Sequence, residues 1–218
     1  MLKFGVSNKL SLNDLSKLND DLSSFIWDFK VGDNILYNFE ILQNLYISRQ
    51  KLQDKDIFNK PITITTVSII EAILLDFLTR IWRATRHSPQ NIDPSIIEKI
   101  KSEIQKKAKK KILKDELFGG RIYFRRNLYQ FKSIIEIFKK YELLGVKENV
   151  IYEHLLKFGK MRNRVHIENY HNDLESNERD VFIPRRLKLL EELLFELWKV
   201  MICKYPRPWS KADKLNFL

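Results

Sequence analysis

The sequence predicts an all-α protein, a helical bundle of about five core helices with an N-terminal helical extension. Apolar residues recur at intervals of three and four along most of the chain, which is the period of an amphipathic helix. Only six glycines and six prolines interrupt 218 residues, so long helices are favoured over many short strands. With 44% hydrophobic and 31% charged residues, the composition is that of a globular protein.

Three helices are expected in the N-terminal part of the chain. A capping box at Ser11 opens the first helix, and a turn at 30–33 ends it. Apolar spacing predicts a second helix over 35–55. The β-branched segment 61–66 is expected to be extended, and a third helix follows over 66–86. Because this third helix is apolar on most sides, it should occupy the centre of the bundle.

Four further helices are expected after the central one. A capping box at Ser95 opens the fourth, whose lysine-rich face runs over 99–114. A glycine pair then breaks the chain before a fifth helix over 124–144. Asn149 can cap the sixth helix, and the seventh begins after Pro184.

The positive charge is concentrated in the second part of the chain. Residues 1–60 hold eight basic and eight acidic residues, whereas 61–218 hold the other 31 basic and 20 acidic residues and therefore the whole net charge of +11. This asymmetry indicates an anionic partner, with nucleic acid favoured over a membrane surface, although a solvated surface is the alternative. We divide the chain into a neutral helical extension (1–60), a basic bundle (61–205) and a tail (206–218).

Several classes of protein are excluded by the composition. The lone Cys203 rules out an intramolecular disulfide and a cysteine-based zinc site. No histidine–carboxylate ligand set and no glycine-rich phosphate loop stand out, so we expect no metal and no cofactor. The first 17 residues lack the apolar core of a signal peptide, and no uninterrupted apolar stretch approaches the length of a membrane span. A cytoplasmic protein without membrane association is expected.

The residues best suited to catalysis lie in and directly after the sixth predicted helix. On a continuous helix, Arg162 and His166 are one turn apart, about 6 Å along the axis, and Asn163 lies at the edge of their face. An arginine offers a planar fork of donors to phosphate, and a histidine exchanges a proton near neutral pH. Together they can bind a phosphodiester and move the proton of a ribose 2′-hydroxyl. The alternative is a structural ion pair of Arg162 with Glu168, with Asp173 or with a carboxylate on a neighbouring helix.

The segment 155–167, Leu-Leu-Lys-Phe-Gly-Lys-Met-Arg-Asn-Arg-Val-His-Ile, resembles the signature helix of the HEPN superfamily (higher eukaryotes and prokaryotes nucleotide-binding). Members carry an arginine, usually followed by a polar residue such as asparagine, and then a histidine. The resemblance implies a compact helical bundle, usually a homodimer with the two motif helices facing each other. Many members are metal-independent endoribonucleases of toxin–antitoxin, abortive-infection or CRISPR-linked systems, and others are inactive modules that bind nucleotides or RNA.

The resemblance also implies roles for individual residues. His166 would act as general acid or base, Arg162 would stabilise the charged transition state, and Asn163 would orient the phosphate or the histidine. The second chain of the dimer would supply a symmetric copy and make the site composite. The family usually has four to six residues between the arginine and the histidine, whereas three separate Arg162 from His166. Six residues separate Arg164 from His171, and we keep Arg164 and His171 as a reserve pair.

Further cations are candidates for binding an RNA backbone. They lie on the lysine-rich face of the fourth helix, in a stretch that interleaves arginines with aromatics, and on the motif helix: Lys106, Lys107, Lys110, Arg121, Arg125, Arg126 and Lys160. The alternatives are a solvated helix face and aromatic residues that enter the core. We therefore expect a metal-independent endoribonuclease acting on RNA in bacterial antiviral defence or a toxin–antitoxin pair, with an antitoxin or other protein as a further partner. The alternative is an inactive module that binds RNA, a nucleotide or a protein.

Overall fold

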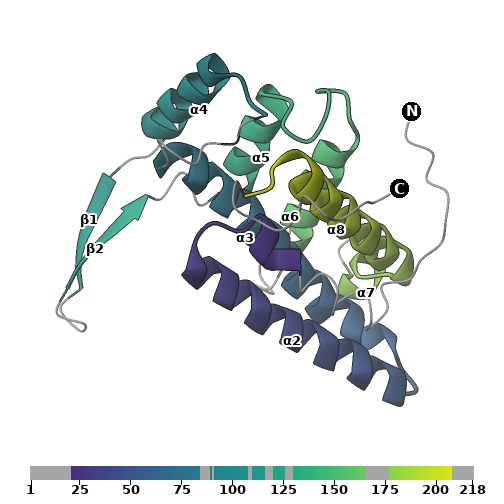
Figure 1. Ribbon diagram of the computed structural model, residues 1–218. Coiled ribbons are helices and arrows are strands. Elements are labelled where there is room, and N and C mark those ends of the chain that lie inside the picture. Colours follow the sequence, from purple (N-terminus) through teal and green to yellow (C-terminus); the bar gives the residue numbers. More distant parts are fainter. Residues whose placement is uncertain are drawn as a thin grey trace.

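The computed structural model describes residues 21–83, 89, 91–107, 110–115, 120–125, 130–164 and 177–207, which form a helical bundle (Figure 1). The prediction of an all-α bundle is confirmed, and one short hairpin is added to it. The elements in chain order, with η marking 3-10 turns, are η1 (Leu22–Ser24), α2 (Phe29–Lys51), η2 (Asp56–Phe58), α3 (Asn59–Arg83), α4 (Pro94–Lys107), β1 (Lys110–Asp115), β2 (Gly120–Arg125), α5 (Phe131–Lys140), α6 (Ile151–Asn163), α7 (Glu178–Val181) and α8 (Pro184–Lys204).

The helix α3 lies at the centre, as predicted, and contacts α2, α4, α5, α6 and α8. Eight of its apolar side chains are almost completely buried: Ile62, Ile69, Ile70, Ile73, Leu74, Phe77, Leu78 and Ile81. Each such side chain stabilises the fold by about 1.5–3 kcal/mol through removal of apolar surface from water. The single hydrophobic core is therefore assembled around α3.

This apolar helix also meets the length and composition of a membrane span. Among the described residues, the helical stretch Asp56–Trp82 is long and apolar enough to cross a membrane by length and composition alone. However, most of its apolar part is buried inside the protein, where the neighbouring helices cover it. Burial in the core of the bundle therefore accounts for its apolar composition.

The helices α2 and α8 flank α3 and meet each other through aromatic side chains. The ring of Trp198 on α8 packs edge-on against Phe25 and Phe39, with centroid separations of 4.8 and 5.6 Å. These residues belong to the same core as α3. The expected boundary between residues 60 and 61 lies inside the first turn of α3, and residues on both sides of it contribute to one core. The predicted first helix lies mostly outside the described residues, as does the tail beyond 207.

Two local predictions in this region are wrong. The turn expected at 30–33 is the first turn of α2, because Asp28 caps that helix by accepting from the N–H groups of Lys30 (3.0 Å) and Val31 (3.3 Å). The segment 61–66, expected to be extended, is helical. Pro61 sits in the first turn of α3, where its missing N–H would have no helical partner. Tertiary burial of the β-branched residues that follow overrides their local preference.

The lysine-rich stretch after α4 is also not helical throughout. The helix starts at Pro94, where Asp93 rather than the predicted Ser95 provides the cap, and it ends at Lys107 instead of continuing to 114. An antiparallel hairpin follows, with Lys110 opposite Arg125 and Ile112 opposite Tyr123. The fifth helix consequently begins at Phe131 instead of 124. Aromatic and β-branched residues favour a pleated strand here, and closely spaced lysines repel one another on a helix.

Two charged side chains of α3 reach into the core and hold both ends of the described chain. The carboxylate of Asp76 accepts from the N–H groups of Trp27 (2.8 Å) and Asp28 (2.9 Å), just before α2. The guanidinium of Arg80, which is 1% exposed, donates to the carbonyls of residues 205–206 after α8, each at 3.0 Å. Burial raises the pKa of Asp76 to about 6, although the two N–H bonds act in the opposite direction.

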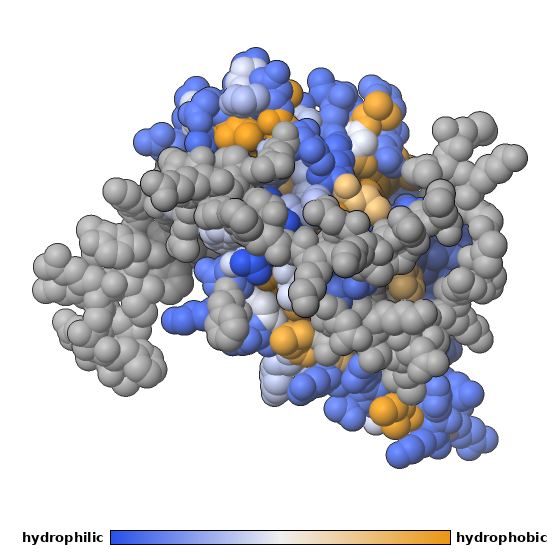
Figure 2. Space-filling view, in the orientation of Figure 1, coloured by the Kyte–Doolittle hydropathy of each residue, from blue (hydrophilic) through white to orange (hydrophobic). Residues whose placement is uncertain are grey.

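The surface carries few exposed large apolar side chains. Among the described residues these are Tyr37, Leu52, Ile57, Val146 and Val150. Figure 2 shows separate small hydrophobic areas among hydrophilic ones on the face that it draws. Scattered apolar residues of this kind are normal for a soluble protein and define no interface by themselves.

We predict that Asp76 makes the stability of the fold depend on pH. Its pKa rises from 3.8 to about 6 on folding, so its contribution to stability is fully present below about pH 4 and is lost as the pH rises through 6. Between pH 4.5 and pH 7, the free energy of unfolding should fall by about 1–3 kcal/mol more in the native chain than in Asp76→Asn. Urea denaturation at both pH values measures this difference. Parallel pH dependences of the two proteins would contradict it.

Candidate functional site

The motif helix α6 is positioned by its apolar face. Ile151, Tyr152, Leu155 and Phe158 are buried in the core, and α6 contacts α3, α5 and α8. The N-cap is Val150 and not Asn149 as predicted, although Oδ1 of Asn149, one residue earlier, accepts from the N–H of Ile151 at 3.0 Å. The buried face of the helix follows from the sequence pattern.

The guanidinium of Arg162, near the C-terminal end of α6, is paired with the carboxylate of Glu71 on α3. Nη1 of Arg162 donates to Oε2 of Glu71, and Nη2 donates to Oε1 at 3.5 Å. The arginine side chain is 26% exposed and the glutamate side chain 16% exposed. This is the ion pair with a carboxylate on a neighbouring helix that the sequence left open as an alternative. A two-point contact of this kind is among the strong hydrogen-bonded arrangements in proteins.

Burial raises the pKa of Glu71 above its ordinary value, and the positive charge of Arg162 offsets part of that rise. The carboxylate is therefore held in an environment that disfavours its charge, and Arg162 is the group that makes this charge tolerable. Because the arginine is still a quarter exposed, the pair lies at the edge of the core, within reach of solvent.

A glycine on α6 makes room for the aromatic ring beneath Arg162. A Cβ placed on Gly159 would come within 2.5 Å of Cδ1 of Phe131, which is closer than side chains tolerate. The ring of Phe131 therefore lies directly against α6, and the guanidinium carbon of Arg162 is 6.0 Å from its centroid. Phe131 and Glu71 together fix the position of the arginine.

The other motif residues are only partly placed. Asn163 is exposed, and Arg164 is buried at the C-cap. His166 and His171 lie outside the described residues. The prediction that one continuous helix carries Arg162 and His166 is wrong, because α6 ends at Asn163. Helical spacing consequently does not determine how far either histidine lies from the arginine.

The cations predicted to bind RNA are distributed over several elements. Lys106 is exposed on α4, Lys107 is the last residue of that helix, and Lys160 is half-buried on α6. Arg126 lies outside the described residues. The register of the hairpin brings Lys110 opposite Arg125, which the sequence had assigned to two different helices.

The same register pairs Lys114 with Arg121. In Figure 1 the two strands extend away from the helices beyond α4. The hairpin is therefore an additional place where basic residues gather.

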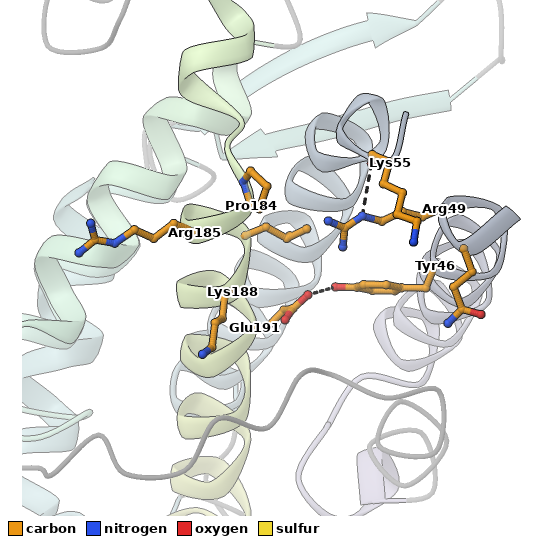
Figure 3. Close-up of a pocket in the computed structure, with 9 residues that line it drawn as sticks. Tyr46, Arg49, Lys55, Pro184, Arg185, Lys188 and Glu191 are labelled. Atoms are coloured by element: carbon orange, nitrogen blue, oxygen red, sulfur yellow. Dashed lines mark hydrogen bonds between the residues drawn. The ribbon is translucent and has the colours of Figure 1, made fainter. Parts of the chain in front are cut away.

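Sequence reasoning did not detect a cavity between α2 and α8, shown in Figure 3. Its lining includes Tyr46 and Glu191, which are 145 positions apart and are joined by a hydrogen bond from the Tyr46 hydroxyl to Oε1 of Glu191 (2.5 Å). One signal was available in the sequence. Glu191 occupies a position of the apolar stripe of α8, where a carboxylate requires a partner.

No group of three or more histidine, cysteine, aspartate or glutamate side chains suited to a metal ion occurs in the described part of the chain. Comparison of the chain with protein-family models, with curated proteins and with solved structures gave no match. What bears on function is therefore the chemistry of the residues and their positions in the fold.

We predict opposite effects of alanine at two helical glycines. Gly159→Ala should destabilise the fold by about 1–3 kcal/mol, because the new methyl group collides with Phe131. Gly32→Ala in α2 is the matched control, since the nearest atom to its Cβ would be at 3.6 Å, an ordinary contact. It should stabilise the fold by up to about 1 kcal/mol through helix propensity. Urea denaturation measures both, and an equal stabilisation of the two variants would refute the packing role of Gly159.

Proposed function

We propose that this chain is a HEPN-like, RNA-directed protein that acts as a metal-independent endoribonuclease in the cytoplasm, as a homodimer with a composite Arg/His site. The observation that carries the proposal is the position of Arg162. The motif arginine lies at the end of α6 against the ring of Phe131 and remains 26% exposed, although it is paired with Glu71. A phosphate that takes the place of the Glu71 carboxylate at this edge of the core would meet a planar fork of donors that is already positioned.

The chemistry follows from the residue types of the motif. Arg162 binds the phosphodiester and stabilises the negative charge that develops on it. His166 moves a proton at the ribose 2′-hydroxyl or at the leaving oxygen, and Asn163, which is exposed beside the arginine, orients the phosphate or the imidazole. Neither step requires a metal ion. The copy of the motif from the second chain completes the site.

The basic residues outside the motif support an RNA substrate. The exposed Lys106 and the paired cations of the β1–β2 hairpin belong to the part of the chain that carries the whole net charge of +11. Such charges attract a polyanion and make its binding sensitive to salt. A role in bacterial antiviral defence or in a toxin–antitoxin pair, with an antitoxin as protein partner, extends this proposal on the resemblance alone.

The pairing of Arg162 with Glu71 also favours a second candidate, a catalytically inactive module of the same kind that binds RNA, a nucleotide or a protein. In that case the arginine serves the fold, and other basic residues carry the binding. The two candidates differ in whether RNA is cleaved.

We predict that His166→Ala lowers RNA cleavage by about two to four orders of magnitude and leaves the midpoint of thermal unfolding unchanged. The assay is the incubation of the full chain with labelled single-stranded RNA in the presence of EDTA. His154→Ala is the matched control, because His154 lies on α6 itself and has no role in the proposed site.

If the native chain cleaves RNA and His166→Ala cleaves it at the same rate, His166 has no role in the mechanism. Salt-dependent RNA binding without cleavage by the native chain would select the inactive module. Absence of both binding and cleavage would contradict an RNA-directed function altogether.

A further inference from the structure

The cavity between the C-terminal part of α2 and the N-terminal half of α8 has the size of a small-molecule site. Its volume is about 530 Å³, within the range of about 300–1,000 Å³ that ligand pockets occupy. None of the residues that line it belongs to the motif or to the cations discussed above. The cavity is therefore separate from the motif.

The charge of the lining is mainly positive. Four cationic side chains line it, Arg49, Lys55, Arg185 and Lys188, against the single acidic residue Glu191. Figure 3 shows the guanidinium of Arg49 pointing across the cavity towards α8, whereas that of Arg185 points away from it. Arg49 and Lys55, which come from the same side, therefore supply the positive charge at the cavity itself.

Arg49 is positioned to bind an anion. Its Nε donates to the carbonyl of Lys55 at 3.3 Å, which ties the side chain to the segment that follows α2. Within the described residues, its two terminal nitrogens have no hydrogen-bond partner, so they remain available as a planar fork. Phosphate oxygens match this geometry, and a lysine beside the fork adds a second charge.

The rest of the cavity suits a flat, less polar group. The ring of Tyr46 on α2 and the exposed ring of Pro184 on α8 face the cavity from opposite sides (Figure 3). Leu187 of α8 also lines it, but this side chain is almost completely buried. The hydrogen bond between Tyr46 and Glu191 closes the floor. Burial, together with the charge of Glu191, raises the pKa of the Tyr46 hydroxyl, so this hydroxyl keeps its proton. The hydrogen-bonded Tyr46–Glu191 pair is thus a fixed polar group at the bottom of the cavity, which can orient a polar substituent of the ligand's ring.

The N-terminal end of α8 adds to the attraction for an anion. This helix is 21 residues long, and Pro184 occupies its first turn at the cavity wall. The positive end of the helix dipole therefore lies on the same side of the ligand space as Pro184. It acts together with Arg49 from α2.

We propose that this cavity binds a phosphate monoester of mononucleotide size, with Arg49 holding the phosphate and the base lying against the exposed ring of Pro184. The phosphate comes either from a free nucleotide or from the end of an RNA strand, since both present the same group. The site does not depend on the nuclease proposal, because it shares no residue with the motif.

The test is an isothermal titration calorimetry experiment at low salt, in which the full chain is titrated separately with AMP, adenosine and inorganic phosphate. We expect saturable binding of AMP, at least about tenfold weaker binding of adenosine, and weak binding of inorganic phosphate. Arg49→Ala and Arg49→Lys should each weaken AMP binding at least about tenfold, because both lose the planar fork. Lys147→Ala, which removes an exposed lysine elsewhere, is the control and should bind AMP normally.

A comparison of 5′-phosphorylated with 5′-hydroxyl RNA of the same sequence separates the two sources. If the native chain prefers the phosphorylated strand and Arg49→Lys loses this preference, the ligand is the end of an RNA strand. If AMP binds and neither strand is preferred, the ligand is a free nucleotide. Equal binding of AMP and adenosine would overturn the proposal, as would unchanged AMP binding by both Arg49 variants. Failure of the native chain to bind AMP at millimolar concentration would also overturn it.

Discussion

The burial of α3 is the constraint on which the rest of this structure depends. A helix that is enclosed on most sides leaves little solvent for charged side chains, and four of those on α3 are bonded to other segments. Lys60 pairs with Glu178 of α7 at 2.7 Å, and Glu71 pairs with α6. Asp76 holds the chain that enters α2, and Arg80 holds the chain that leaves α8. The polar residues of the central helix thus join segments that are far apart in sequence.

The candidate site is a consequence of the same constraint. Arg162 is placed by Glu71, so the bond that orders the motif arginine also occupies its donors. A phosphate that replaces the carboxylate forms the same kind of bonds, and the cost is the uncompensated Glu71 left behind. Because burial already raises the pKa of Glu71, protonation of that carboxyl can reduce this cost. The pair is therefore compatible with a structural role and with exchange for a substrate.

The features that the sequence predicted correctly are those set by local periodicity. The 3.6-residue spacing identified α3 as central and placed the start of α8 at Pro184. The hairpin was missed because its lysines fit a charged helix face as well as a strand, and the preference of Tyr123 and its neighbours for a strand was outweighed. The partner of Arg162 was expected only as some carboxylate, since a contact across 91 positions leaves no trace in spacing. The cavity at Tyr46 and Glu191 depends on a similar long-range contact.

The affinity of Glu71→Gln for single-stranded RNA tests most directly whether Arg162 exchanges its carboxylate partner for phosphate. This substitution keeps the shape of the side chain and removes the competing charge. We expect RNA binding at low salt to become about tenfold tighter, which corresponds to an ion pair worth about 1.4 kcal/mol. We also expect this gain to vanish when Arg162→Ala is added. Unchanged or weaker binding by a folded Glu71→Gln protein would show that Arg162 serves the fold alone.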